Sequence, residues 1–217
     1  MSIKKSLIVV LSVALVCAAT VTGTLAYLTG SANGGKGIKN TFMAAGDKLA
    51  DDFKIIEHDV VTDEKGSYVT GTGTGDEGNT YEILPGETLP KDAKMVIDGK
   101  TKVQAYLYLE VCEDMTKDVY TWELADCWVL LEGVTGKNNG LVYIYSDEKG
   151  TPVIVTEDLE VEIIKGGVVT VGDVDISEIT DDTLSFYGYL AQASVGTPAE
   201  AFAACFGGEA ASSSTAE

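Results

Sequence analysis

The sequence predicts an all-β protein built as a two-sheet sandwich or a barrel. Over residues 105–111, Ala, Leu and Val occupy the odd positions and Tyr or Glu the even ones, which is the period-two pattern of a strand with one buried face. Residues 158–163 repeat this pattern with acidic residues outward, a stripe that also deters edge-to-edge pairing. Turn signals separate many short apolar runs at the spacing typical of sandwiches and barrels.

The remaining elements follow in chain order. Strands are expected at residues 53–61, 81–84, 95–98, 128–131, 141–145, 168–171 and 184–192. Residues 63–66 and 147–150 share the sequence Asp-Glu-Lys-Gly, which predicts two hairpin corners, each closed by a glycine at positive φ. Pro85 with Gly86, and residues 138–140, predict further turns of the same kind, closed by Gly86 and Gly140 at positive φ.

One short helix is expected near the C-terminus, over Pro198–Phe206. Thr197 is a suitable N-cap, Pro198 suits the first helical position, and Glu200 lies in the first turn. The Ser- and Ala-rich residues 208–217 are expected to be a disordered tail.

The N-terminus has the three-part layout of a secretory signal. Lys4 and Lys5 precede an apolar run at residues 7–16, and small residues follow. Cleavage is expected after Ala26, which makes Tyr27 the new N-terminus. The run is shorter than the roughly 20 apolar residues of a spanning helix, so an uncleaved anchor is the less favoured alternative.

The predicted domain organisation follows from this cut. Residues 1–26 are the signal helix, 27–50 a flexible N-terminal segment, 51–207 the β-sandwich and 208–217 the tail. Lipid attachment at Cys17 is disfavoured because bulky residues precede it and it lies inside the apolar run.

The charge of the chain excludes several classes of partner. Its 34 acidic and 15 basic residues give a formal net charge of -19, and every basic residue is Lys. A nucleic-acid partner needs clustered cations, usually with Arg, so nucleic-acid binding is not expected. A basic patch for an anionic membrane is not expected either, and contact with a membrane is expected only through the signal before cleavage.

Three cysteines remain after cleavage, namely Cys112, Cys127 and Cys205. One disulfide with one free thiol, and three unpaired thiols, are both compatible with the spacing.

The glycine motif formed by Gly73, Gly75 and Gly78 has the G-x-G-x-x-G spacing of a dinucleotide-binding loop. A strand-like segment follows it rather than a helix whose N-terminus could hold a pyrophosphate, so we expect a flexible loop over residues 71–78.

The sequence contains no catalytic motif. His58 is the single histidine, so it is at most a weak candidate for a metal ligand or general base, and a structurally satisfied or surface histidine in a strand is favoured. Asp181 and Asp182 lack EF-hand spacing, and a solvated acidic face is favoured over calcium binding. We therefore expect no catalytic residue, no cofactor and no enzymatic activity.

Several separated motifs nevertheless fall in one order that resembles a known family. In chain order these are residues 24–29 at the cleavage region, 40–42 leading to Gly46, 84–88 followed by Lys91 and Asp92, 105–107, 143–145 after Trp128, and 199–202. In this order they resemble the TasA/camelysin family of exported Gram-positive proteins, which includes biofilm-matrix and spore-coat-associated members whose signals are cut by a SipW-type signal peptidase.

The resemblance implies a jelly-roll β-sandwich, secretion to the cell surface or extracellular matrix, and, for some members, assembly into biofilm fibres. The expected donor of an intersubunit strand is the freed N-terminal segment, with Tyr27, Leu28, Ile38 and Phe42 as its apolar residues. The expected partners are further copies of the chain, the SipW-type peptidase during export and other matrix or surface proteins. A camelysin-like surface metalloprotease centred on His58 and a non-polymerising adhesin or binding module are the alternatives.

Overall fold

The computed structural model describes residues 30–31, 49–75, 78–175 and 182–207 of the 217-residue chain. In these parts the chain folds as an antiparallel β-sandwich with a short C-terminal helix, which confirms the predicted fold class. The predicted signal helix, its cleavage between Ala26 and Tyr27, and the tail lie outside the described residues. The predicted assembly residues Tyr27, Leu28, Ile38 and Phe42 also lie outside them.

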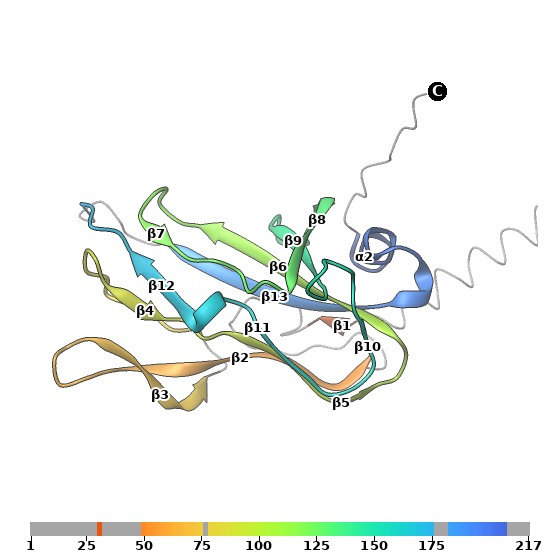
Figure 1. Cartoon of the computed structure of the whole chain (residues 1–217), viewed down its shortest axis with the longest axis horizontal. Helices are drawn as coiled ribbons and strands as arrows, with labels where there is room; N and C mark the ends of the chain where they lie inside the picture. The colour runs from red at the N-terminus through yellow and green to blue at the C-terminus, as the bar shows by residue number, and fades with distance from the viewer. Residues whose placement is uncertain (1–29, 32–48, 76–77, 176–181, 208–217) are drawn as a thin grey trace, which may run out of the picture.

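The first layer of the sandwich is a sheet in the order β1-β13-β6-β9-β8, with β10 paired to β6 (Figure 1). Its long central strands, β6 and β13, pair along ten residues, from Thr183 opposite Asp114 to Gln192 opposite Ala105. The strands of this layer are β1 (Gly30–Ser31), β6 (Ala105–Asp114), β8 (Trp128–Thr135), β9 (Leu141–Tyr145), β10 (Ile154–Val155) and β13 (Thr183–Gln192).

The second layer consists of two smaller sheets, in the orders β11-β5-β2-β3 and β4-β12-β7. Two backbone hydrogen bonds extend the β4–β12 and β5–β11 ladders toward each other: Lys91 N donates to Gly167 O (2.7 Å), and Ile163 N donates to Ala93 O (2.9 Å). Because β4 runs directly into β5 and β11 into β12, the same two chain segments pair in both sheets. The two sheets therefore form one bent layer in which long strands are interrupted. Its strands are β2 (Ala50–Thr62), β3 (Tyr68–Gly75), β4 (Thr88–Pro90), β5 (Lys94–Thr101), β7 (Tyr120–Thr121), β11 (Leu159–Glu162) and β12 (Val168–Val171).

The main hydrophobic core lies between the two layers. The side chains at the odd positions of 105–111 are buried, as the alternation predicts, and Leu107 and Leu109 are 0% exposed. Val161 and Ile163 are buried from the other layer, whereas Glu160 points outward from the edge strand β11. The core also contains Phe53, Ile55, Met95, Ile97, Trp128, Ile164, Phe186 and Leu190.

A second cluster lies on the outer face of the first layer, under helix α2 (Pro198–Phe206). Phe202 and Phe206 of this helix contact Tyr189, and Phe202 also contacts Tyr108. The predicted cap is confirmed: Glu200 N donates to Thr197 Oγ1, and Thr197 N donates to the Glu200 carboxylate. The two reciprocal bonds form a capping box that fixes where the helix begins.

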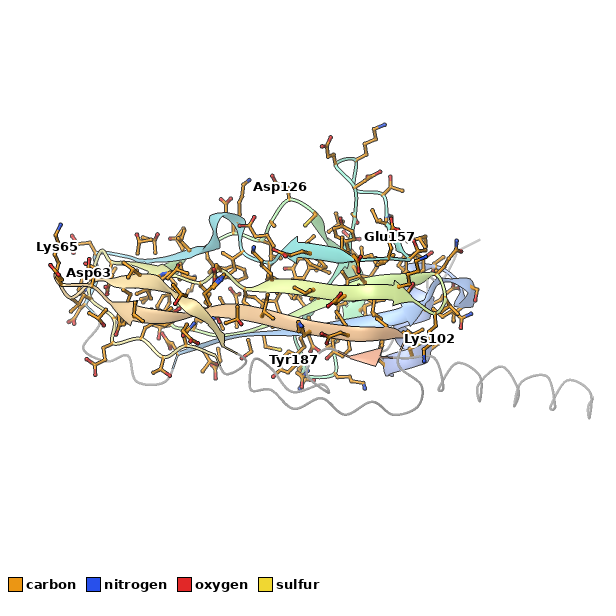
Figure 2. All side chains as sticks on the ribbon, turned by 90° about the horizontal axis from the view of Figure 1, so that it is seen from below. Asp63, Lys65, Lys102, Asp126, Glu157 and Tyr187 are labelled. Atoms are coloured by element: carbon orange, nitrogen blue, oxygen red, sulfur yellow. The ribbon has the colours of Figure 1, made fainter. Side chains whose placement is uncertain are left out.

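The two Asp-Glu-Lys-Gly turns adopt the same conformation, as predicted. Gly66 and Gly150 have φ values of 84° and 77°. In each turn the Asp carboxylate accepts two backbone N–H groups, at Lys65 and Ser67 in the first and at Lys149 and Thr151 in the second. Figure 2 shows Asp63 and Lys65 at one end of the sandwich and Lys102 at the opposite end.

Four sequence predictions about the second layer and the turns need correction. Residues 81–84 form no strand, although Tyr81 and Ile83 pack on a small cluster around Leu89. Residues 71–75 belong to β3 and not to a loop. The sandwich begins before residue 51, because Leu49 and Ala50 are 1% and 3% exposed and Ala50 opens β2. In the turn at residues 138–140, the positive φ falls on Asn139.

Candidate functional site

The first candidate site is the edge of β13 that faces β1, called here the β13 edge. β1 pairs antiparallel with β13, with Gly30 opposite Leu190 and Ser31 opposite Tyr189 (Figure 1). Residues 27–50 were expected to be a flexible segment, so this pairing corrects that expectation at residues 30 and 31. A sheet edge of this kind presents backbone N–H and C=O groups that can pair with an added strand.

β13 itself is held firmly by its other neighbours. It pairs with β6 along its whole length, and Tyr189 and Leu190 are 0% exposed. The Tyr189 ring lies 4.9 Å from Phe206 and 5.6 Å from Phe202, measured between ring centroids. Burial raises the pKa of Tyr189, and its hydrogen bond to Glu110 raises the pKa further. The tyrosine is therefore a neutral hydrogen-bond donor at every physiological pH.

Glu110 anchors β13 to the turn between β8 and β9. Its carboxylate is 0% exposed and accepts the Tyr189 hydroxyl at 2.6 Å. It also accepts the backbone N–H groups of Asn138 (2.7 Å) and Gly140 (3.0 Å) and the Asn138 side-chain amide (3.0 Å). A Cβ atom at Gly140 would lie 2.6 Å from Cys112 Sγ, so only glycine lets the turn approach the carboxylate this closely.

The second candidate site surrounds His58, where β2 changes partners. Residues 50–56 of β2 pair with β5, and Glu57 and His58 pair with β3. His58 N donates to Asp92 Oδ1 (3.0 Å), and its ring Nδ1 lies 2.6 Å from Asp92 Oδ2. The Asn79 side chain donates to His58 O and accepts from Val60 N. Side chains thus take over the hydrogen bonds that β5 no longer supplies.

The Asp92 carboxylate responds to these contacts. Partial burial would raise its pKa, but the hydrogen bonds from His58 outweigh burial and hold the pKa below the usual value for aspartate. His58 is therefore a satisfied strand residue, as the sequence favoured.

A buried ion pair lies beside this site on the inner face. Lys91 Nζ is 3.0 Å from both carboxylate oxygens of Glu57, and the two residues are 8% and 2% exposed. The Lys91 ammonium also lies 5.9 Å from the centroid of the Phe186 ring. Two consecutive residues of β2 thus bind two consecutive residues between β4 and β5. Glu57 binds Lys91 on the inner face, and His58 binds Asp92 on the outer face.

This arrangement supplies little chemistry. The described residues contain no group of three or more His, Cys, Asp or Glu side chains that could hold a metal. In the same part of the chain, the hydrogen-bond partners of His58 are Asp92 and Asn79, so no hydroxyl or thiol is placed for activation by the imidazole. The geometry is that of a structural junction.

The other sequence candidates are placed as follows. Cys112, Cys127 and Cys205 are free thiols, and burial raises the pKa of Cys112 and of Cys205 to about 11. Gly73 lies in β3 beside the Asp59 carboxylate, and not in a loop before a helix N-terminus. Asp182 accepts from Thr116 Oγ1 (2.9 Å), and Asp181 lies outside the described residues.

Sequence reasoning missed Glu110, Tyr189 and Lys91 as organising residues. The alternation at residues 105–111 placed Glu110 correctly on the face opposite the core, but that face is buried by the turn at residues 138–140 and by α2. A carboxylate in the middle of a strongly apolar strand was the available signal.

The chain matches no protein-family model, no curated protein and no solved structure. None of the helices in the described residues is long and apolar enough to cross a membrane.

Proposed function

We propose that this chain is an exported structural protein of the cell surface or extracellular matrix that assembles head to tail by strand addition. In the proposal, the N-terminal segment of one subunit pairs with the β13 edge of the next. The observation that carries it is the pairing of Gly30 and Ser31 with Leu190 and Tyr189, because it shows that residues of this segment fit the β13 edge in antiparallel register.

The dimensions of the two partners support this proposal. β13 has ten residues, which span about 33 Å as a strand. Residues 27–42 would reach about 50 Å when extended, so the segment is long enough to follow the whole edge. Contact between the donor of one subunit and the acceptor of another is heterologous, and such contacts generate open filaments when the rotation does not close a ring.

Charge also favours the N-terminal segment as the donor. Residues 27–46 contain Lys36 and Lys39 and no carboxylate, in a chain with a formal net charge of -19. Most other surfaces of two copies would repel each other, whereas this segment is attracted to an acidic neighbour.

Export and processing fit the same scheme. The predicted signal would carry the chain out of the cell, and a SipW-type signal peptidase, implied by the family resemblance, would cut after Ala26. Until that cut the donor is tethered to the membrane, so processing would permit assembly. Other matrix or surface proteins are further partners under this proposal.

Deletion of residues 27–40 tests the proposal. We expect the processed chain to form filaments visible by electron microscopy after incubation, and the deletion variant to stay folded by circular dichroism but form none. Deletion of residues 208–217 is the matched control, since it shortens the other end and should leave filament yield unchanged. Filaments of normal yield from the first variant would refute strand donation by this segment.

A further inference from the structure

We propose that β1 is an intramolecular cap on the β13 edge, which keeps the processed monomer from accepting a donor strand until the cap is displaced. The inference rests on the proposed function, because it concerns the regulation of the same edge. β1 and β13 belong to one subunit, so the position that a donor must enter is already occupied. Assembly is then an exchange of one strand for another rather than simple addition.

The cap is placed at a fully buried part of the acceptor. It pairs with Tyr189 and Leu190, both 0% exposed, and the hydroxyl of Tyr189 is held by Glu110. A donor that pairs along β13 must cross these two residues. By occupying these two positions, β1 prevents a donor from pairing along β13, although it does not cover the whole strand.

The cap is also built to be released. It has two residues, Gly30 and Ser31, against ten in the pairing of β13 with β6. Neither residue has an apolar side chain that could anchor the strand in the core. A donor that pairs along more of β13 makes more ladder hydrogen bonds than the cap and can replace it.

Concentration decides between the two arrangements. A segment of the same chain acts at an effective concentration in the millimolar range, so the short cap competes well when free subunits are dilute. A receptor whose binding-competent state is populated to one part in ten binds its ligand about tenfold more weakly. Capping therefore predicts a monomer that is stable at low concentration and assembles with a lag at high concentration.

The test measures binding of a fluorescein-labelled peptide of residues 27–42 to the processed chain, residues 27–217, by fluorescence anisotropy. The acceptors are the unmodified chain and the double variant Gly30→Pro, Ser31→Pro, whose prolines remove the backbone N–H groups of the cap. Ser212→Pro is the control for proline in a terminal segment, and a scrambled peptide is the control for composition. Near-ultraviolet circular dichroism confirms that each acceptor is folded.

We expect the double variant to bind the peptide at least about tenfold more tightly than the unmodified chain, with the control variant unchanged. Equal, measurable binding by the double variant and the unmodified chain would overturn the cap and leave strand donation standing. Failure of both to bind the peptide would overturn strand donation, and the cap with it.

Discussion

Replacement of Glu110 by Ala is the sharpest test of how the acceptor strand is held. The substitution removes the carboxylate but leaves the N–H groups of Asn138 and Gly140 and the Tyr189 hydroxyl in place. Each buried donor left without an acceptor costs about 1–3 kcal/mol. Because the three are neighbours and the turn can relax, we expect a loss of about 3–6 kcal/mol, a large part of the roughly 5–15 kcal/mol that stabilises a typical domain.

Two further variants separate the hydrogen bonds from the volume of the side chain. Glu110→Gln keeps one oxygen for the two backbone donors, and its amide can donate to the Tyr189 hydroxyl. We therefore expect this variant to lose only about 1–2 kcal/mol of stability. Glu113→Ala is the matched control on the same strand, because Glu113 is exposed and accepts one hydrogen bond, from Trp122 Nε1 at 2.8 Å. We expect that control to lie within about 1 kcal/mol of the unmodified chain.

Urea unfolding monitored by tryptophan fluorescence measures all three. With a slope of about 2 kcal/mol/M, Glu110→Ala should lower the midpoint by about 1.5–3 M. A midpoint within about 0.3 M of the unmodified chain would show that the hydrogen bonds to this carboxylate contribute no net stability.

Three further predictions concern the remaining polar groups. Lys91→Ala should lower the free energy of unfolding in urea by about 3–5 kcal/mol, because it leaves the buried Glu57 carboxylate without its partner. Lys94→Ala, which breaks the exposed pair of Lys94 Nζ with Glu160 Oε1 (2.7 Å), should lower it by at most about 1 kcal/mol, and equal losses would contradict this. The pKa of Asp92 is lower in the folded chain than the usual aspartate value, so the stability that its ionised carboxylate contributes is present above about pH 4 and is lost as the pH falls through the folded pKa. Asp92→Asn should therefore lose less stability between pH 7 and pH 3 than the unmodified chain. An equal loss by both chains would refute the stabilising role of the Asp92 carboxylate. Cys112 and Cys205, with pKa values of about 11, should react with a thiol reagent at pH 7.5 much more slowly in the folded chain than in urea, and rapid native labelling would refute their burial.

The elements predicted correctly are those whose sequence pattern is dictated by the main core or by the second cluster under α2. The strand at residues 105–111 and β9, β12 and β13 each place alternate side chains against buried neighbours, so period-two patterning located them. The helix was located by local chemistry alone, since Thr197, Pro198 and Glu200 fix its start.

The elements that escaped prediction do not pack against that core. β3 alternates Thr with Gly because its glycines make room for Asp59 and its threonines face solvent, so it carries no hydrophobic period. Residues 81–84 carry such a period because Tyr81 and Ile83 pack on the cluster around Leu89, but they lack a ladder partner among the described residues.

The polar contacts of both candidate sites were beyond sequence reasoning for a different reason. Glu57 and His58 meet residues 34 positions away, and Glu110 meets Tyr189 79 positions away. Glu110 is distinguished only by its place within an apolar strand, and nothing local distinguishes Glu57 from the many acidic residues that face solvent. Only the bend of the second layer and the position of the turn at residues 138–140 bring the partners together.

Under the proposed function, the features of the sheet edges favour β13 over β11, β3 and β8 as the acceptor of a strand. β11 carries the outward Glu160 and Glu162, β3 is irregular between its pairings at Thr70 and Thr74, and β8 shifts register after Leu130. Acidic side chains and bulges are the devices by which natural edges resist pairing. β13 pairs with β6 without a register shift, and Glu110 and α2 hold it in shape from the outer face. A rigid acceptor beside a cap of two small residues is the combination that strand exchange requires, because the acceptor need not reorganise when one partner replaces another.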